Sequence, residues 1–327
     1  MQANYAVLFK VYYWDDFVER QYQRLLACAS KGDVFIVVDD TIRTVPPIDH
    51  PRVFRITPED LRALPLANEA GNNLFWYNAD YPVYHFHGKH PDYPFYVNFE
   101  YDAVLNGNLD ELVAGSTARN VDYMAQPVRE TVEEWVFTPT HLPVYSKEDI
   151  AGYLSCIAVL SNRAVRLLLE RRLAMTACWQ QGEMKFWPIS EVFMGTELKR
   201  AGMATEPLSN HGSTAEYNWW PPHLEDDLGA LQGHKFLHPV LPRENYIVST
   251  LRNEAAILSY FKEGSDLRSK MHRFPRTVYG EPVRQEFVRR IKRKSRRHMR
   301  AWSGALAARW RSWRLSRGSQ VASLGNG

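Results

Sequence analysis

The 327-residue sequence has only three cysteines, and their spacing is not that of a disulfide framework or a zinc site. Cys28, Cys156 and Cys178 are far apart, and each lies among apolar residues, so we predict buried free thiols in a reducing compartment. The longest apolar runs are too short to span a bilayer. A strand-like segment begins within the first few residues, so we expect no cleavable signal peptide.

The sequence also lacks several widespread catalytic motifs. It contains no G-x-G-x-x-G dinucleotide fingerprint, no Walker A loop, no G-x-S-x-G nucleophile elbow and no H-E-x-x-H pair. These absences argue against Rossmann oxidoreductases, P-loop NTPases, α/β-hydrolases and zinc proteases of the H-E-x-x-H type.

Acidic residues are scarce near the C-terminus. Between Arg284 and Arg317 there are thirteen Lys and Arg residues and a single acid, Glu286. Without this stretch, the totals of 40 basic and 37 acidic residues become 27 and 36, so the rest of the chain is acidic. We therefore predict a globular domain over residues 1–270 and a basic, helical tail over residues 271–327.

The sequence does contain alternating strand and helix patterns. Residues 5–11 form an apolar strand pattern, residues 17–30 repeat apolar side chains at helical spacing, and residues 34–38 form a near-continuous apolar run. This order predicts a βαβ unit, and with it an α/β fold whose mixed, mostly parallel sheet is flanked by helices. His85 and His87 alternate as on a strand, but the spacing supplies no third ligand for zinc.

Two of the strand patterns end in carboxylates. Asp39 and Asp40 follow the run over residues 34–38, and Glu100 and Asp102 follow the strand pattern over residues 93–99. Ligands of βαβ units bind outside the carboxyl ends of the strands, so we expect these acids to meet at one edge of the sheet. Paired carboxylates suit Mg²⁺ or Mn²⁺. The alternative is that they only cap surface strands in water.

Several short segments, taken in order, carry a resemblance to a known family. They are residues 6–11, 37–41 (V-V-D-D-T), 76–84, 99–102 (F-E-Y-D), 160–165, 190–198 and 238–240 (H-P-V). Together they resemble nucleotide-sugar-dependent glycosyltransferases of the GT-A fold, over roughly residues 5–240. The F-E-Y-D segment stands where that family has its D-x-D metal motif, with Glu100 in place of the usual first aspartate.

The resemblance implies a metal-dependent enzyme that moves a sugar from a nucleotide-sugar donor to a glycan or a lipid-linked acceptor. Asp102 is then the first choice as metal ligand for Mn²⁺ or Mg²⁺, with Glu100 on a ribose or a metal-bound water and His238 completing the shell. Asp39 or Asp40 would contact the nucleotide base or ribose. For His238 the alternative is a hydrogen-bonded loop histidine, and for one of the two aspartates a turn or capping role.

Glu191 is the candidate general base for the acceptor hydroxyl. It stands at a predicted helix start after Trp187, where partial screening from water raises the pKa of a carboxyl. The alternatives are Glu197, or a Glu191 that only caps the helix, because a helix N-terminus favours a carboxylate without any catalytic role. Further aromatic candidates for stacking on sugars, each with a core position as its alternative, are Trp76, Tyr77, Trp219 and Trp220.

The basic tail carries apolar residues at helical steps among its arginines, a pattern typical of a helix lying in a lipid headgroup layer. We therefore expect an anionic membrane surface as a partner, and a cytoplasmic protein that is peripheral on the inner face of the cytoplasmic membrane. A solvated arm, or a helix packed on the acidic body, is the alternative.

Two other classes of function remain open from the sequence. One is a catalytically silent GT-A scaffold or sugar-nucleotide-binding protein. The other is a nucleic-acid-binding protein that uses its basic tail. We expect no nucleic acid, because the acidic body would repel a duplex and no recognised binding module is present.

Overall fold

The structure, a computed structural model, describes residues 4–68, 75–142 and 144–296. Backbone contacts divide the chain into two compact units. The N-terminal unit ends at Pro242, and the C-terminal unit begins at Arg243.

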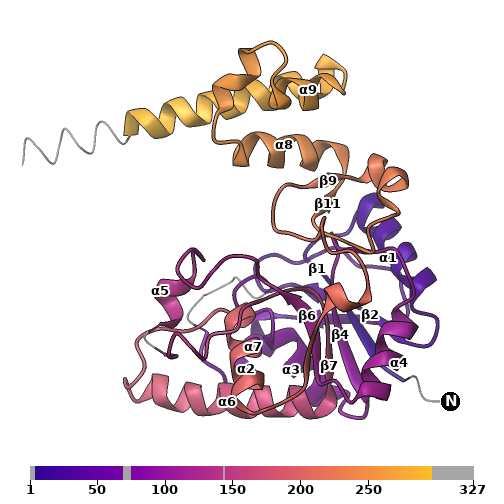
Figure 1. Cartoon of the computed structure of the whole chain (residues 1–327), viewed down its shortest axis with the longest axis vertical. Helices are drawn as coiled ribbons and strands as arrows, with labels where there is room; N and C mark the ends of the chain where they lie inside the picture. The colour runs from indigo at the N-terminus through magenta and orange to yellow at the C-terminus, as the bar shows by residue number, and fades with distance from the viewer. Residues whose placement is uncertain (1–3, 69–74, 143, 297–327) are drawn as a thin grey trace, which may run out of the picture. The chain divides into compact units, whose positions relative to one another are not determined.

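A seven-stranded sheet forms the centre of the N-terminal unit (Figure 1). Its strands lie in the order β3-β2-β1-β4-β7-β6-β8. β7 runs antiparallel to its neighbours β4 and β6, and the other neighbouring pairs are parallel. The bounds are β1 Ala6–Val11, β2 Asp33–Asp39, β3 Val53–Ile56, β4 Phe95–Glu100, β6 Tyr123–Pro127, β7 Tyr153–Ser161 and β8 Thr205–Pro207. This mixed, mostly parallel α/β sheet confirms the predicted fold class.

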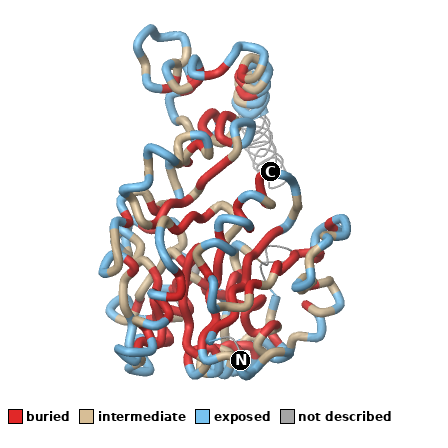
Figure 2. The backbone as a smooth tube through the Cα atoms, turned by 90° about the vertical axis from the view of Figure 1, so that its right-hand side faces the viewer, coloured by how far each residue is buried: buried red, intermediate tan, exposed pale blue. Residues whose placement is uncertain are grey.

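Helices cover both faces of the sheet, and its strands form the buried centre (Figure 2). Val7 and Phe9 of β1 pack with α1 and α4 on one face, whereas Ala6 and Leu8 pack with α3, α6 and α7 on the other. The bounds are α1 Asp16–Cys28, α2 Pro58–Ala63, α3 Tyr81–Lys89, α4 Leu109–Arg119, α5 Thr138–His141, α6 Asn162–Gln180 and α7 Ser190–Arg200.

The chain order creates a switch point between β1 and β4. From β1 the chain continues to β2 and β3 on one side, and then returns past β1 to reach β4 on the other side. Connections diverge at such a point and leave a crevice outside the carboxyl ends of the strands. The ends of β1, β2, β4 and β6, together with the start of the antiparallel β7, share this edge.

A small two-stranded sheet joins the loop after β4 to a segment late in the N-terminal unit, and a second small sheet lies within that segment. β5 Val104–Leu105 pairs with β10 Phe236–Leu237, and β9 His223–Leu224 pairs with β11 Val240–Leu241. The N–H of Val240 also donates to the carbonyl of Asp102 at 2.7 Å. The 3₁₀ helices η1 Leu208–His211 and η2 Glu225–Leu231 lie in the same segment. It therefore brings residues near position 238 to the carboxyl end of β4.

The expected strand at His85 and His87 is wrong, because both residues lie in helix α3. Pro82 occupies the first turn of α3, where a missing N–H leaves no hydrogen bond unmade. The consecutive residues Val83 and Tyr84 are both buried, whereas a strand with one solvated face would bury only one of them. The alternation of His85 and His87 therefore does not indicate a strand, because both belong to a helix.

The C-terminal unit is helical over its described part. Its elements are α8 Arg243–Asn253, the 3₁₀ helix η3 Ile257–Phe261, α9 Asp266–His272 and a helix over residues 276–296. Tyr246 of α8 contacts Phe274, and Arg290 donates to carbonyl oxygens at the end of α8. Because α8 packs within this unit, the division lies at Pro242, whereas the predicted boundary at residue 270 falls inside α9.

The rest of the expected tail, residues 297–327, lies outside the described residues. In the part of the chain that the structure describes, no helix combines the length and the apolarity needed to cross a membrane.

Candidate active site

A cavity of about 1040 Å³ lies at the switch-point edge of the sheet. Ligand sites are typically clefts of about 300–1,000 Å³ at such positions. Lys10 at the end of β1, Asp39 at the end of β2 and Glu100 at the end of β4 all line it. Glu191 and His238 reach it from α7 and from the loop between β10 and β11. The predicted meeting of strand-end acids at one edge therefore occurs for Asp39, Glu100 and Asp102.

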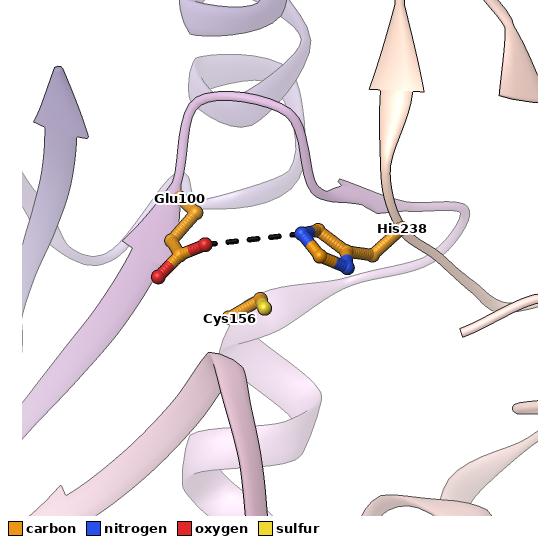
Figure 3. A group of neighbouring side chains, drawn as sticks. All are labelled: Glu100, Cys156 and His238. Atoms are coloured by element: carbon orange, nitrogen blue, oxygen red, sulfur yellow. Dashed lines mark ion pairs between the residues drawn. The ribbon is translucent and has the colours of Figure 1, made fainter. Parts of the chain in front are cut away.

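Two carboxylates and one imidazole converge inside the cavity. The Nε2 atom of His238 lies 3.8 Å from Oε2 of Glu100 and 3.6 Å from Oδ1 of Asp102. Figure 3 shows the Glu100 and His238 side chains pointing toward each other. Oδ1 of Asp102 is buried and has no hydrogen-bond partner among the described residues. Glu100 and Asp102 thus each lie near His238, but Asp102, the first choice of the sequence analysis, is not among the described side chains whose ligand atoms all lie within 4.8 Å of one another.

The hydrogen bond at the other nitrogen of His238 fixes its tautomer. Nδ1 lies 2.6 Å from the carbonyl oxygen of Asn218, and because a carbonyl can only accept, Nδ1 carries the hydrogen. In its neutral form the ring then presents the lone pair of Nε2 to two carboxylates. That arrangement is repulsive unless a cation or a proton lies between them, and it is how protein histidines bind metal ions. The donor set therefore fits a divalent cation.

Lys10 is the only lysine among the described residues that line the cavity, and it is buried beside Glu100. It is 1% exposed, and its Nζ lies 3.2 Å from Oε1 of Glu100. Burial raises the pKa of Glu100, but the nearby charge of Lys10, the largest cause that opposes burial, contributes to a pKa that is lowered overall. For Asp102, burial raises the pKa to about 6, and the charge of Glu100 acts in the same direction.

Cys156, near the start of β7, belongs to the same cluster, although the sequence analysis did not assign it to the site. Its thiol is free and buried, as predicted for all three cysteines, whereas Cys28 and Cys178 are free but only partly buried. One ligand atom from each of Glu100, Cys156 and His238 lies within 4.8 Å of the other two (Figure 3). Lys10 was missed as well, although a lysine within an otherwise apolar strand pattern was a signal for it.

Glu191 occupies the first turn of α7 and lines the cavity. Burial is the main cause that raises its pKa to about 8, and the charge of Glu100 adds to it; a hydrogen bond from the backbone of Ser155 opposes both. Glu197, the alternative base, is buried further along α7, pairs with Arg171 and Arg200, and does not line the cavity. Of the two acids, only Glu191 can reach a ligand bound there.

A buried ion pair holds the segment that leads into α7. Arg172 and Asp80 are both 0% exposed, and Nε of Arg172 lies 2.7 Å from Oδ2 of Asp80. A second nitrogen of Arg172 donates to the carbonyl of Pro188 at 3.2 Å, and its guanidinium lies 3.7 Å from the ring centroid of Phe193. This arginine therefore links α3, α6 and the start of α7 behind Glu191.

The structure distinguishes Asp39 from Asp40. Asp39 lines the cavity, and its carboxylate accepts hydrogen bonds from the backbone N–H and the hydroxyl of Thr41. Asp40 does not line it, because its carboxylate pairs with Arg55 at 2.6 Å and accepts from the N–H of Val45 at 2.7 Å. Asp39 is thus available to a ligand, and Asp40 has the turn-stabilising role that was its alternative.

Hydrogen bonds join two loops that line the cavity, the loop after β6 and the loop between η1 and β9. Arg129 donates to the carbonyl of Thr214 at 2.7 Å, and the indole N–H of Trp219 donates to Glu130 at 3.2 Å. Trp219 is 65% exposed, and Trp76 and Trp220 also line the cavity. The remaining aromatic candidate, Tyr77, does not line it, because its hydroxyl donates to the carbonyl of Trp187.

No family model and no curated protein matches the chain. Among solved structures, it is similar to the apo form of mouse xyloside xylosyltransferase 1, with 12% identity, a TM-score of 0.39 and coverage of 72% of this chain and 97% of that one. It is also similar to an active-site mutant of LgtC, with 9% identity, a TM-score of 0.37 and coverage of 69% and 77%. A third is the galactosyltransferase LgtC in complex with donor and acceptor sugar analogues, with 8% identity, a TM-score of 0.38 and coverage of 69% and 78%. Xyloside xylosyltransferase 1 and LgtC are both glycosyltransferases.

Proposed function

We propose that this protein is a glycosyltransferase that moves a sugar from a nucleotide-sugar donor to a glycan or a lipid-linked acceptor, assisted by a divalent cation. The observation that carries the proposal is the convergence of Glu100, Asp102 and the Nε2 lone pair of His238 at the switch point of an α/β sheet. The cavity around them is large enough for a sugar and a nucleotide.

Asp102, Glu100 and His238 would hold the cation, Mn²⁺ or Mg²⁺ on the sequence resemblance. A bound divalent cation supplies Lewis-acid stabilisation of the negative charge on a departing diphosphate. The residues around it would bind the donor. Asp39, which lines the cavity, would accept a hydrogen bond from a ribose hydroxyl or a base N–H, and Arg43 adds positive charge to the cavity wall.

Glu191 would take the proton of the acceptor hydroxyl. Its pKa of about 8 lies close to neutral pH, which is where a general base acts best. The loops joined by Arg129 and Trp219 would exclude water, which otherwise competes with the acceptor for the donor sugar. Trp76 and Trp220 offer faces on which a sugar ring can stack.

A panel of nucleotide sugars, tested by thermal shift with and without Mn²⁺ or Mg²⁺, examines the proposal. A true donor stabilises the protein by mass action, by about 2.7 kcal/mol at a hundred times its Kd. Asp102→Asn should remove the cation-dependent part of this shift and abolish turnover, while the melting temperature without ligand stays within a few degrees of wild type. The exposed acid Asp92 provides the control, since Asp92→Asn should change nothing.

Turnover in Asp102→Asn equal to that of the wild type would refute the metal assignment. Stabilisation by a nucleotide sugar without transfer or hydrolysis would instead identify a sugar-nucleotide-binding protein. An absence of any nucleotide-dependent shift would refute the proposed donor class.

A further inference from the structure

The thiol of Cys156 lies within the group of side chains that would hold the cation. Its Sγ, one oxygen of Glu100 and one nitrogen of His238 lie within 4.8 Å of one another (Figure 3). Cys156 is 5% exposed and His238 is 8% exposed, so the wall around them is closed on most sides. Asp102 adds a further buried oxygen on the same side of His238.

This donor set differs from one made only of oxygen. Thiolate and imidazole ligands select zinc and neighbouring transition metals, whereas Mg²⁺ and Mn²⁺ prefer carboxylate, carbonyl and water. In a tetrahedral zinc site the ligand atoms lie about 2.0–2.3 Å from the metal. Atoms within 4.8 Å of one another need only a small inward movement of side chains to reach such distances. The thiol binds in its deprotonated form, so its proton is released to solvent on binding.

We propose that Cys156 is a metal ligand and that the site takes a thiophilic divalent cation, Zn²⁺ or Co²⁺, in preference to Mg²⁺ or Mn²⁺. The proposal rests on the metal site of the proposed function, with a different choice of cation. Cys156, Glu100 and His238 provide sulfur, oxygen and nitrogen donors, and Asp102 supplies the fourth protein ligand or leaves that position to a ligand molecule.

Cobalt spectroscopy tests this inference without an activity assay. Titration of the metal-free full-length protein with Co²⁺ should give one equivalent bound, with a thiolate-to-cobalt charge-transfer band in the near ultraviolet. Zn²⁺ should displace the cobalt, and Mg²⁺ at the same concentration should not. Cys156→Ser should lose the charge-transfer band and bind Zn²⁺ at least about tenfold more weakly.

The matched control is Cys178→Ser, which removes a free thiol of α6 that belongs to no described metal cluster and should keep the band. Thermal melts of the metal-free variants show whether each one folds, and Cys156→Ala provides a second replacement. Cobalt binding without a charge-transfer band, or an unchanged band in folded Cys156→Ser, would overturn the inference. If the band is present and no sugar is transferred, the metal assignment stands and the proposed function fails.

The C-terminal unit carries a separate feature, a row of four apolar side chains, of which three are exposed and Phe287 is partly buried. Leu258 and Phe261 are 70% and 65% exposed and lie three residues apart in η3, where residues at this spacing eclipse each other. The ring of Phe261 contacts the ring of Phe287 at 5.1 Å between centroids. Phe287 belongs to the helix over residues 276–296, and Ile291, which is 63% exposed, lies one turn further along that helix. We call these four residues the apolar row.

Basic residues continue from the end of the apolar row. Lys292, Arg293, Lys294 and Arg296 are exposed, and none of them forms an ion pair with another described residue. Arg289 and Arg290, by contrast, are engaged with the buried Glu286. Large apolar groups beside unpaired basic ones are the composition of a surface that lies at the headgroup level of a bilayer.

We infer that the apolar row and the basic residues beside it dock the protein on an anionic lipid bilayer. The apolar side chains enter the boundary between headgroups and acyl chains, and the ammonium and guanidinium groups contact anionic headgroups. The positive charge of residues 292–296 favours this occupant over a protein surface of neutral charge, because anionic lipid attracts each basic group near the surface.

Co-sedimentation of the full-length protein with vesicles tests this inference. Binding should be strong to vesicles of phosphatidylcholine with phosphatidylglycerol, weak to phosphatidylcholine alone, and reduced by salt. The double variant Phe261→Ser with Ile291→Ser should lower the bound fraction at least about tenfold on the scale expected for buried apolar groups. Leu173→Ser, which removes an apolar side chain of α6 that is 38% exposed, is the matched control and should bind as the wild type does.

Equal vesicle binding by the wild type and the double variant would overturn the inference, as would the absence of binding by the wild type. A dimer seen by light scattering that dissociates in the double variant would overturn it too, because the row would then be a contact between copies of the chain. A salt-sensitive mobility shift with RNA that competes with vesicles would reassign the basic residues to nucleic acid.

Discussion

Replacing Arg172 by methionine tests how the start of helix α7, which carries Glu191, is held in place. Methionine keeps much of the length of the side chain and removes its charge and all of its donors. The guanidinium donates to Asp80 at 2.7 Å and to the carbonyl of Pro188 at 3.2 Å, and neither Arg172 nor Asp80 is exposed to water. The substitution therefore leaves the Asp80 carboxylate buried without its cation.

Breaking a buried ion pair by removing one partner costs about 3–5 kcal/mol, because the remaining charge has lost both water and its counterion. We expect Arg172→Met to lower the free energy of unfolding by an amount in this range. In the double variant with Asp80→Asn no charge is left buried, so its loss should be smaller than the sum of the two single losses by about 0.5–3 kcal/mol.

Urea unfolding followed by tryptophan fluorescence measures both quantities. The ring of Trp187 lies 5.0 Å from the Arg172 guanidinium and thus reports on this part of the N-terminal unit. A loss below about 1 kcal/mol in Arg172→Met would refute the reasoning, since water would then have to reach Asp80. Strict additivity of the two variants would show that the pair is not coupled.

Three further predictions concern α7 and the cavity. Because the pKa of Glu191 is raised in the folded protein, the folded state binds this proton more tightly than the unfolded chain does. The free energy of unfolding should therefore fall as pH rises from 4.5 to about 8. Glu191→Gln should flatten this slope in thermal melts across that range. The same variant should lower turnover by about 10²–10⁴ with donor affinity nearly unchanged, whereas loss of donor binding would indicate a structural role. Gly195→Ala should destabilise the protein although alanine favours helices, because the new Cβ would lie 2.4 Å from the carbonyl of Ala151 and from the ring of Tyr153; an equal or higher melting temperature would contradict this.

The sequence predicted those parts of the fold that depend on local patterns. The apolar runs over residues 5–11 and 34–38 became β1 and β2, because parallel strands buried on both faces need apolar side chains at nearly every position. The convergence of Asp39 with Glu100 followed from the rule that parallel strands share their carboxyl edge. Helix α3 was misassigned, because three residues of His-Phe-His are too few to distinguish a period of two from a period of 3.6.

The sequence patterns could not predict features that depend on pairing between distant segments. Cys156 reaches the site because β7 runs antiparallel beside β4, so the first part of β7 meets the last part of β4. Asp40 leaves the site because β3 places Arg55 beside it. The periodicity of a single segment predicts neither the direction of β7 nor the position of β3. Both depend on the order of strands in the complete sheet.

The position of His238 in the sequence has a consequence for how such a protein can diverge. Among the described residues it is the last along the chain to line the cavity, and the C-terminal unit begins shortly afterwards at Arg243. Every described side chain that lines the cavity therefore precedes the junction. Replacement of residues 243–327 by recombination at that junction would leave those side chains unchanged. Proteins that arise in this way would keep the same cavity and differ in the segment that follows it.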